Sequence, residues 1–258
     1  MIRYFAILIS FSALLARADD AATTKLTAAG ITEFTAAYQA WDGARFGKAA
    51  EFFRQASTNT SATVTNFYWL GAAQFHRMLQ LQNSPGNSTN KDVAEAALDA
   101  AVEALLTAVK LDEKHAESHA LLGTLYGMKI GDSIIRGAWF GQRVVKHRDL
   151  AIALGAENPR VRYLFGMCQF HTASKPSAWQ ETLTTLLAAE KLFETESKRA
   201  NDSTEPRWGR SSCLTFIGET YERLGQRTKA ADYFRKALAE HPADHLAKAG
   251  LARVVEKK

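Results

Sequence analysis

Small and large side chains recur at fixed offsets near the end of this 258-residue chain. Between Ile217 and Pro242 the pattern is carried by Gly218, Tyr221, Gly225, Ala230, Phe234, Ala237 and Pro242. The small residues Gly218 and Ala230 would let a pair of helices cross closely, with aromatic rings filling the space beside the crossing. Gly225 suits the turn between the helices, and Pro242 cannot continue the second one. The pattern therefore predicts a helix-turn-helix unit.

These offsets resemble the tetratricopeptide (TPR) repeat, where they are positions 8, 11, 15, 20, 24, 27 and 32 of a 34-residue unit. The resemblance implies repeats of two helices, A and B, stacked into a right-handed superhelix. Composition agrees, because alanine is abundant and only five prolines occur, which favours helix nearly throughout. We therefore expect an all-α fold, a right-handed superhelical TPR solenoid.

Earlier parts of the chain repeat fragments of the pattern. Three further A helices are marked by glycine at position 8, in Leu70-Gly71, Leu122-Gly123 and Phe165-Gly166. A degenerate first repeat has Ala37 at position 8 and Phe53 at position 24. We expect one domain over residues 19–258 with about five repeats, at approximately 30–63, 64–115, 116–158, 159–210 and 211–244, and a capping helix over 244–256.

The stretch from Leu122 through Asn158-Pro159-Arg160 to Gly166, with Trp208-Gly209 downstream, resembles a poorly characterised group of bacterial envelope TPR proteins. The resemblance covers roughly residues 119–242. It implies a fold and an exported location, and no established activity. The chain departs from that group at Ser177-Ala178, where such proteins tend to carry two glycines.

Three segments are longer or more irregular than the repeat requires. Residues 80–90 and 197–205 are polar, so we expect loops there. The segment 127–147 is punctuated by glycine where a short turn would suffice, and it contains Ile134, Ile135, Trp139 and Phe140. Large apolar side chains are usually buried, so we expect this segment to be partly ordered, with these four residues covered.

Residues 1–18 have the pattern of a secretory signal peptide. A short basic start precedes an apolar run over residues 5–15, and Ala16-Arg17-Ala18 is a small-x-small cleavage site. The apolar run is too short to cross a bilayer, which takes about 20 residues, so we expect no stable membrane span after cleavage. The remaining chain would have 30 basic and 27 acidic residues and would be exported, to the periplasm or outside the cell.

The two cysteines and the charges set limits on partners. The repeat frame separates Cys168 and Cys213 by about 10 Å along the helix axes, beyond the reach of a disulfide, so we expect two buried free thiols. The 32 basic residues are scattered among acidic ones and form no basic block, and we expect no nucleic acid partner.

The A helices of stacked TPR units form the concave wall, chiefly through positions 2, 5, 9, 12 and 13. In this chain the wall is aromatic over most of its length. The candidate residues for a partner groove are Tyr38, Trp41, Tyr68, Phe75, His76, Tyr163, Met167, Phe170 and His171. Other TPRs capture an acidic C-terminus with lysine or arginine at positions 2, 5 and 6 and asparagine at position 9. Here no lysine or arginine stands at position 5 and no asparagine at position 9, so we do not expect that mode of binding.

One coincidence has two interpretations. Gln, Phe and His stand at equal repeat positions in residues 74–76 and 169–171. The pair of motifs could line a site for a peptide or a small apolar ligand. Alternatively, His76 and His171 simply end their helices, where a cation is favourable.

We find no constellation that carries catalysis. The spacing of His115 and His119 could place two zinc ligands on a helix, but His115 falls in the turn before it, and a zincin needs glutamate directly after the first histidine. No phosphate loop, nucleophile elbow or dinucleotide fingerprint occurs. We expect no enzyme, no cofactor and no metal, and a module that binds a peptide or an envelope protein in the groove. The alternative is a small-molecule carrier or transporter-associated subunit, with residues 127–147 folding over a cavity lined by Trp139, Phe140 and His171.

Overall fold

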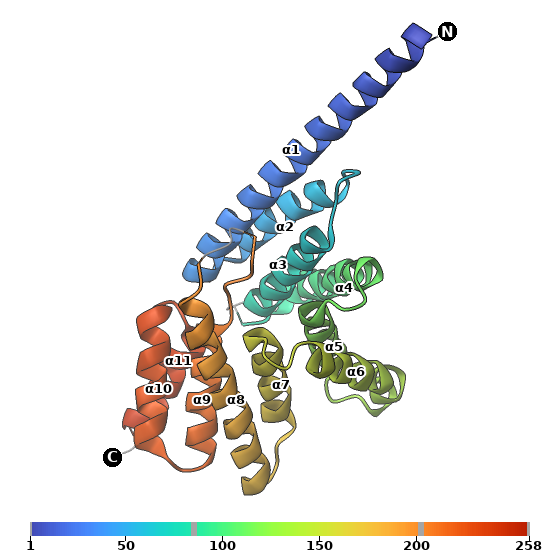
Figure 1. Ribbon diagram of the computed structural model, residues 1–258. Helices are drawn as coiled ribbons and strands as arrows, with labels where there is room; N and C mark the ends of the chain where they lie inside the picture. The colour runs from blue at the N-terminus through green and yellow to red at the C-terminus, as the bar shows by residue number, and fades with distance from the viewer. Residues whose placement is uncertain (1, 84–86, 201–203, 257–258) are drawn as a thin grey trace. The chain divides into compact units, whose positions relative to one another are not determined.

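The structure is a computed structural model that describes residues 2–83, 87–200 and 204–256. The side chains of residues 2–18, 87–89 and 256 lie outside the description as well. The side chains of the expected signal peptide and of its cleavage site are therefore not described, and both features stay predictions. Over the described ranges the chain is helical, with no strand (Figure 1).

The helices follow one another with short connections. Their bounds are α1 Ile2–Ala40, α2 Gly43–Ser57, α3 Val64–Gln82, α4 Asn87–Leu111, α5 Ala116–Ile130, α6 Ile134–Leu154, α7 Pro159–Thr172, α8 Pro176–Ser197, α9 Arg210–Arg223, α10 Arg227–Glu240 and α11 His245–Glu256. Helices that are adjacent in the chain pack as pairs, including α3 with α4, α5 with α6, α7 with α8 and α9 with α10. The all-α TPR fold expected from the sequence is confirmed.

The chain divides into two compact units, which we describe separately. The N-terminal unit comprises residues 1–38 and 42–113, and the C-terminal unit comprises residues 39–41 and 114–258. The first holds α1 to α4 and the second holds α5 to α11. In the C-terminal unit α11 packs on α9 and α10, as expected for a capping helix.

The glycines at repeat position 8 lie where helices A and B touch. A β-carbon on Gly218 would stand 2.7 Å from the ring of Phe234, and one on Gly166 would stand 2.5 Å from Leu186. Both distances are shorter than carbon atoms tolerate, so only glycine allows these helices to approach so closely. The spacing in the sequence therefore reflects helix packing directly.

Side-chain caps start several of the helices. The carboxylate of Asp42 accepts from the backbone N–H of Ala44 at the start of α2, and the amide oxygen of Asn158 accepts from that of Arg160 at the start of α7. Pro159 occupies the first turn of α7, where its missing N–H costs nothing. His115 caps α5 by accepting from the backbone N–H of Ser118, which satisfies an amide that the helix leaves free.

Two segments expected to be irregular contain helix. The polar segment 80–90 holds the end of α3 and the start of α4. The segment 127–147 holds the end of α5, a connection over residues 131–133 and most of α6. The side chain of Ser133 caps the start of α6. Glycines are tolerated within α6, where Gly141 meets nothing within 4 Å.

The expected burial within α6 is wrong for three of the four residues. Ile134 is 92% exposed, and Ile135 and Trp139 are each 74% exposed. Phe140 alone is half-buried, stacked on Tyr126 of α5 with ring centroids 5.8 Å apart. The physical reason is that α5 covers only one face of α6 and the apolar residues lie on the opposite face.

Both cysteines are free, with Cys213 buried and Cys168 half-buried. The Cys213 thiol donates to the carbonyl of Leu186, 3.5 Å away. Burial raises the pKa of the Cys213 thiol well above its usual value. Within the described residues, no helix is long and apolar enough to cross a membrane.

Candidate partner-binding surface

The candidate groove residues of the N-terminal unit belong mostly to its core. Tyr68 and Phe75 on α3 are each 1% exposed, and His76 is buried beside them. The His76 ring lies 5.1 Å from that of Phe34 on α1 and 5.5 Å from that of Phe46 on α2. Preceding helices therefore cover this end of α3, and Tyr68, Phe75 and His76 present no open wall.

His76 is neutral in this environment. Its Nδ1 lies 2.8 Å from the carbonyl oxygen of Ala72, so this nitrogen carries the proton and donates it. Burial among aromatic rings lowers the pKa of His76 to about 4, although the hydrogen bond to Ala72 acts in the opposite direction. The ring packs as an apolar aromatic group at neutral pH.

Tyr38 and Trp41 lie at and just beyond the end of α1, and both are half-buried. Tyr38 stacks on Phe34 with ring centroids 6.2 Å apart. Trp41 has a φ of 53°, the left-handed conformation that L side chains seldom adopt. It groups with the C-terminal unit, where its ring centroid is 6.2 Å from that of His241.

A buried ion cluster joins three helices of the C-terminal unit. Arg160 on α7 donates from Nε to Glu117 on α5 at 2.8 Å. Its other two guanidinium nitrogens each donate to one carboxylate oxygen of Glu196 on α8. Asn158 donates to the same Glu117 oxygen at 2.7 Å. Arg160, at position 2 of the fourth repeat, therefore holds α7 against α5 and α8, and its guanidinium is not available to a ligand.

Further along α7 the side chains become progressively more exposed. Tyr163 and Met167 are buried, and the Tyr163 hydroxyl donates to the Met167 sulfur at 3.8 Å. Phe170 is half-buried and His171 is exposed. Only the last turn of α7 therefore offers the surface that the sequence predicts along the whole helix.

At that last turn, rings from three helices meet. The Phe170 ring centroid lies 5.1 Å from that of Trp179 on α8 and 5.2 Å from that of Phe216 on α9. His171 lies 5.7 Å from Phe216, and the guanidinium of Arg223 stands 5.6 Å from the Trp179 ring. We call this group, comprising Phe170, His171, Trp179, Phe216 and Arg223, the α7–α9 aromatic surface.

Sequence reasoning missed Trp179 and Phe216. Trp179 lies in the first turn of a B helix, and Phe216 stands at position 6, next to the position 5 that conventionally lines the groove. Both side chains are half-buried. An aromatic residue at position 6, facing an aromatic end of the preceding A helix, is the signal that could have identified them.

The surface has a neutral centre and a positive rim. Partial burial lowers the pKa of His171, so the ring is uncharged at neutral pH. The acidic residues of α9 are engaged elsewhere, because Arg253 on α11 binds Glu219 at 2.6 Å and Glu222 at 2.8 Å. Arg223 is exposed beside the rings. The arrangement suits an apolar group followed by a negative one.

The two Gln-Phe-His motifs occupy different environments. His76 lies within α3, six residues before its end at Gln82, and is enclosed by rings. His171 stands in the last turn of α7, where a cation would be favourable. Equal repeat positions thus give a core residue in one unit and a surface residue in the other.

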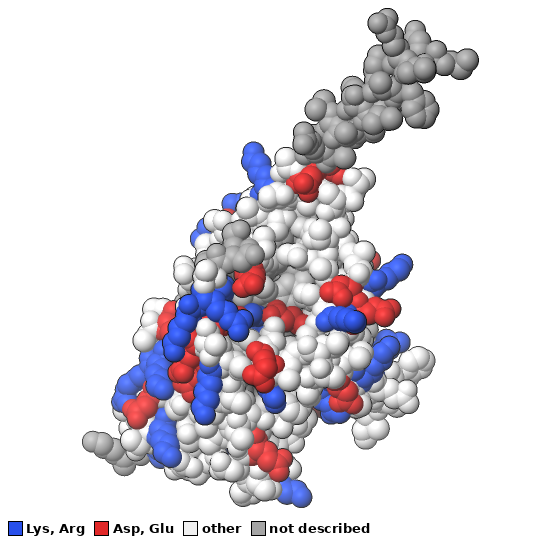
Figure 2. Space-filling model, viewed as in Figure 1, with Lys and Arg blue, Asp and Glu red and all other residues white. Residues whose placement is uncertain are grey.

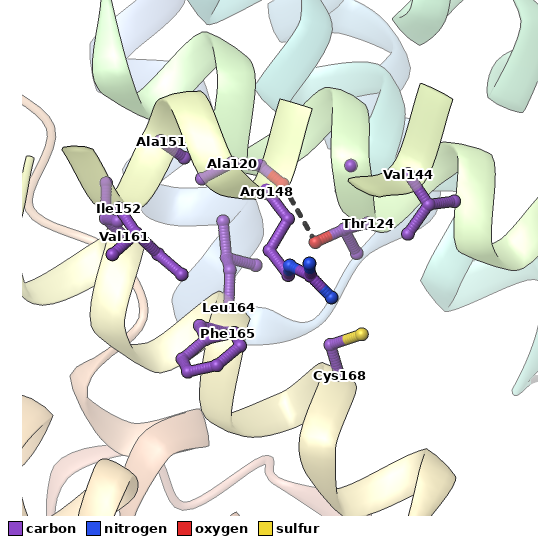
Figure 3. A pocket seen from close by; sticks show the side chains of 11 residues that line it. Ala120, Thr124, Val144, Arg148, Ala151, Ile152, Val161, Leu164, Phe165 and Cys168 are labelled. Atoms are coloured by element: carbon purple, nitrogen blue, oxygen red, sulfur yellow. Dashed lines mark hydrogen bonds between the residues drawn. The ribbon is translucent and has the colours of Figure 1, made fainter. Parts of the chain in front are cut away.

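A small hollow lies between α5, α6 and α7 (Figure 3). Its volume of about 20 Å³ would hold about one water. Apolar side chains such as Val161 and Leu164 form one wall, and Arg148, Thr124 and Cys168 lie toward the other end. The cavity expected under residues 127–147 was to be lined by Trp139, and the high exposure of this residue contradicts that lining.

The histidines near α5 do not assemble a metal centre. The Nδ1 atoms of His119 and His147 are 2.8 Å apart, so one ring donates to the other. His115 faces Ser118 as the helix cap instead. Within the described ranges, no group of three or more histidine, cysteine or acidic side chains could hold a metal ion.

Charges of both signs are interspersed on the face shown in Figure 2.

The comparison with protein families gives a match that covers most of the chain. The family model described as regulator of microtubule dynamics protein 1-3 matches residues 34–256. The chain belongs to this family.

Among solved structures, this family member is similar to a thermophilic TPR protein of Thermus thermophilus, with a TM-score of 0.59. The two are 14% identical, and the match covers 88% of this chain and 99% of the other. No curated protein matches the chain. The structural likeness confirms the TPR fold that the spacing in the sequence predicts.

Proposed function

We propose that this family member is a noncatalytic interaction module that binds an extended peptide segment of a protein partner at the α7–α9 aromatic surface. One observation carries the proposal: half-buried rings from α7, α8 and α9 converge beside an exposed arginine. Aromatic residues and arginine are the side chains that contribute most often to binding energy at protein interfaces.

The chemistry of the surface indicates the kind of peptide. Phe170 and Phe216 offer an edge-to-face pair against which an apolar side chain can pack. Arg223 lies at the rim with five N–H donors, a geometry suited to a carboxylate. The favoured ligand is therefore a peptide with a large apolar residue followed closely by an acidic one.

The location of the partner follows from the N-terminal segment. Residues 1–18 have the order of features that directs secretion, so we propose that the chain is exported and that its partner is an envelope protein or a peptide. A second candidate comes from the family match, because the family is described by regulators of microtubule dynamics. Tubulin is therefore the alternative partner.

A peptide selection tests the proposal. Random peptides displayed on phage would be selected against the full chain, and the selected sequences synthesised and titrated by calorimetry. We expect enrichment of an apolar residue next to Asp or Glu, and weaker binding by a Phe170→Ala, Phe216→Ala variant. A matched control is Leu246→Ala, which alters an exposed apolar residue on α11. Selected peptides that bind the double variant as tightly as the parent would refute the site.

Microtubule cosedimentation separates the two candidate partners. Purified, polymerised tubulin would be pelleted with the parent chain and with the double variant. Binding of the parent that is lost in the variant supports the surface with tubulin as the partner. Pelleting that is equal for both would place microtubule binding elsewhere and contradict tubulin as the occupant of the α7–α9 aromatic surface.

A further inference from the structure

The first half of α6 exposes large apolar side chains to solvent. Ile134 is 92% exposed, Ile135 and Trp139 are 74% exposed, and Val145 is 46% exposed. Ala138, between them, is exposed as well. We call these five residues the α6 apolar arc. Single exposed apolar residues are ordinary, but a contiguous group indicates an interaction site.

The residues of the arc share one face of the helix. At about 100° per residue, the five side chains span about 140° of the circumference. The opposite face packs on the protein, since His147 and Ala151 are buried and Phe140 stacks on Tyr126. The helix therefore packs one face against the protein, while no other described residue covers the second, apolar face.

Basic residues accompany the arc. Between Asp132 and Asp149 the sequence contains four basic residues, Arg136, Arg143, Lys146 and Arg148, of which Arg148 pairs with Asp149 at 2.8 Å. Arg136, Arg143 and Lys146 are exposed. In Figure 2, Lys and Arg side chains lie next to protruding uncharged atoms in the region where Figure 1 places α6.

We infer that the α6 apolar arc docks on an anionic lipid surface, independently of the peptide-binding surface. An amphipathic helix with tryptophan on its apolar face and lysine or arginine beside it lies in the membrane interface, buried to about 5–10 Å. Tryptophan itself is enriched at that depth, because its ring is apolar and its N–H is polar. The contact is peripheral and requires no spanning helix.

The shape and the charge of the site favour lipid over a protein partner. The arc is convex, and its most exposed residue, Ile134, stands at the very start of the helix. Such side chains can insert between lipid headgroups without a complementary pocket. The exposed Arg136, Arg143 and Lys146 complement anionic headgroups, whose attraction for lysine and arginine falls off within a Debye length.

Vesicle binding by the full chain tests this inference. Vesicles of pure phosphatidylcholine would be compared with an equal mixture of phosphatidylcholine and phosphatidylglycerol by cosedimentation. We expect stronger binding to the anionic vesicles. An Ile134→Ser, Ile135→Ser, Trp139→Ser variant should lose about tenfold or more in partitioning, because three apolar side chains no longer enter the interface. An Arg136→Gln, Lys146→Gln variant should lose binding to the anionic vesicles specifically, by about fivefold for each charge removed.

The controls separate the arc from the rest of the chain. Residues 1–18 are identical in every variant, so differences among variants report α6. Leu111→Ser alters an exposed apolar residue on α4, and Lys248→Gln removes an exposed charge on α11. Both should bind as the parent does. Since all these side chains are exposed, circular dichroism and thermal unfolding should stay unchanged.

Fluorescence locates the contact. Brominated lipids should quench Trp139 in the bound parent, and a Trp139→Phe variant should keep vesicle binding while losing most of the quenching. The other tryptophans, Trp41, Trp69, Trp179 and Trp208, are buried or half-buried. Equal binding by the serine variant, quenching that persists without Trp139, or binding to neither kind of vesicle would overturn the inference. So would self-association of the parent that the serine variant abolishes, since a second copy would then be the occupant.

Discussion

The Phe216 ring on α9 meets the Phe170 ring on α7 edge to face, with centroids 5.2 Å apart and planes at 75°. This contact joins consecutive TPR repeats and leaves part of each ring exposed. Edge-to-face pairs contribute about 0.5–1.5 kcal/mol beyond the area they bury, so the two rings hold each other in place. A ligand would meet a surface that is already ordered.

The buried Arg160 should be essential for the stability of the C-terminal unit. An Arg160→Met substitution leaves Glu117 and Glu196 without the guanidinium that both of them bind. Removing one partner of a buried ion cluster costs about 3–5 kcal/mol. Urea unfolding followed by circular dichroism would measure this loss.

Arg235→Met is the matched control for that substitution, because Arg235 pairs with Asp232 on the exposed side of α10. Exposed pairs contribute little, so the control should unfold at the parent's urea concentration. Equal stability of the two variants would show that the cluster at Arg160 does not hold α5, α7 and α8 together.

The helix crossing at Gly218 should tolerate no larger side chain. A β-carbon there would stand 2.7 Å from the Phe234 ring, which Gly250 also confines from the α11 side. Gly218→Ala should therefore lower the free energy of unfolding by about 1–3 kcal/mol through overpacking. Gly127→Ala in α5, with nothing within 4 Å, should instead raise it by about 0.5–1 kcal/mol. Thermal unfolding of the two variants would decide, and stabilisation by both would contradict the packing.

Stability should decline in mild acid. The pKa values of His76 and His147 are each lowered from 6.5 to about 4, chiefly by burial. The unfolded chain therefore binds more protons than the folded one between these values. The free energy of unfolding should fall as pH decreases from about 6.5 to about 4, by about 1 kcal/mol per pH unit for each histidine.

Urea unfolding across that pH range would measure the slope. His76→Gln should remove the contribution of the N-terminal unit, while His147→Gln should remove that of the C-terminal unit. His171→Gln should also reduce the slope, because partial burial lowers the pKa of this ring as well. Slopes that are unchanged in both buried variants would show that protonation of these rings does not govern acid stability.

The TPR spacing predicted the fold because glycine and ring positions follow directly from helix crossings, as at Gly218 and Phe234. The spacing could not distinguish His76 from His171, since burial depends on what neighbouring helices place beside each position. Rings of α1 and α2 enclose His76, whereas His171 meets only Phe170 and Phe216 among the described rings. The periodic pattern says which residues face the same side, and neighbouring side chains decide which of them reach solvent.

Helix α6 shows a second limit of sequence reasoning. Its glycines suggested an irregular segment, yet the cap at Ser133 and the contacts with α5 keep it helical. The expectation that Ile134 and Trp139 are covered rested on general burial preferences, which fail on the face of α6 turned away from α5.

The most direct test of the partner-binding surface is hydrogen–deuterium exchange of the full chain with and without a selected peptide. We predict that protection on binding concentrates in the last turn of α7, the first turns of α8 and the C-terminal half of α9, and that the Phe170→Ala, Phe216→Ala variant loses it. Protection confined to α3 and α4, or protection of α7 to α9 that persists in the double variant, would contradict the assignment of this surface.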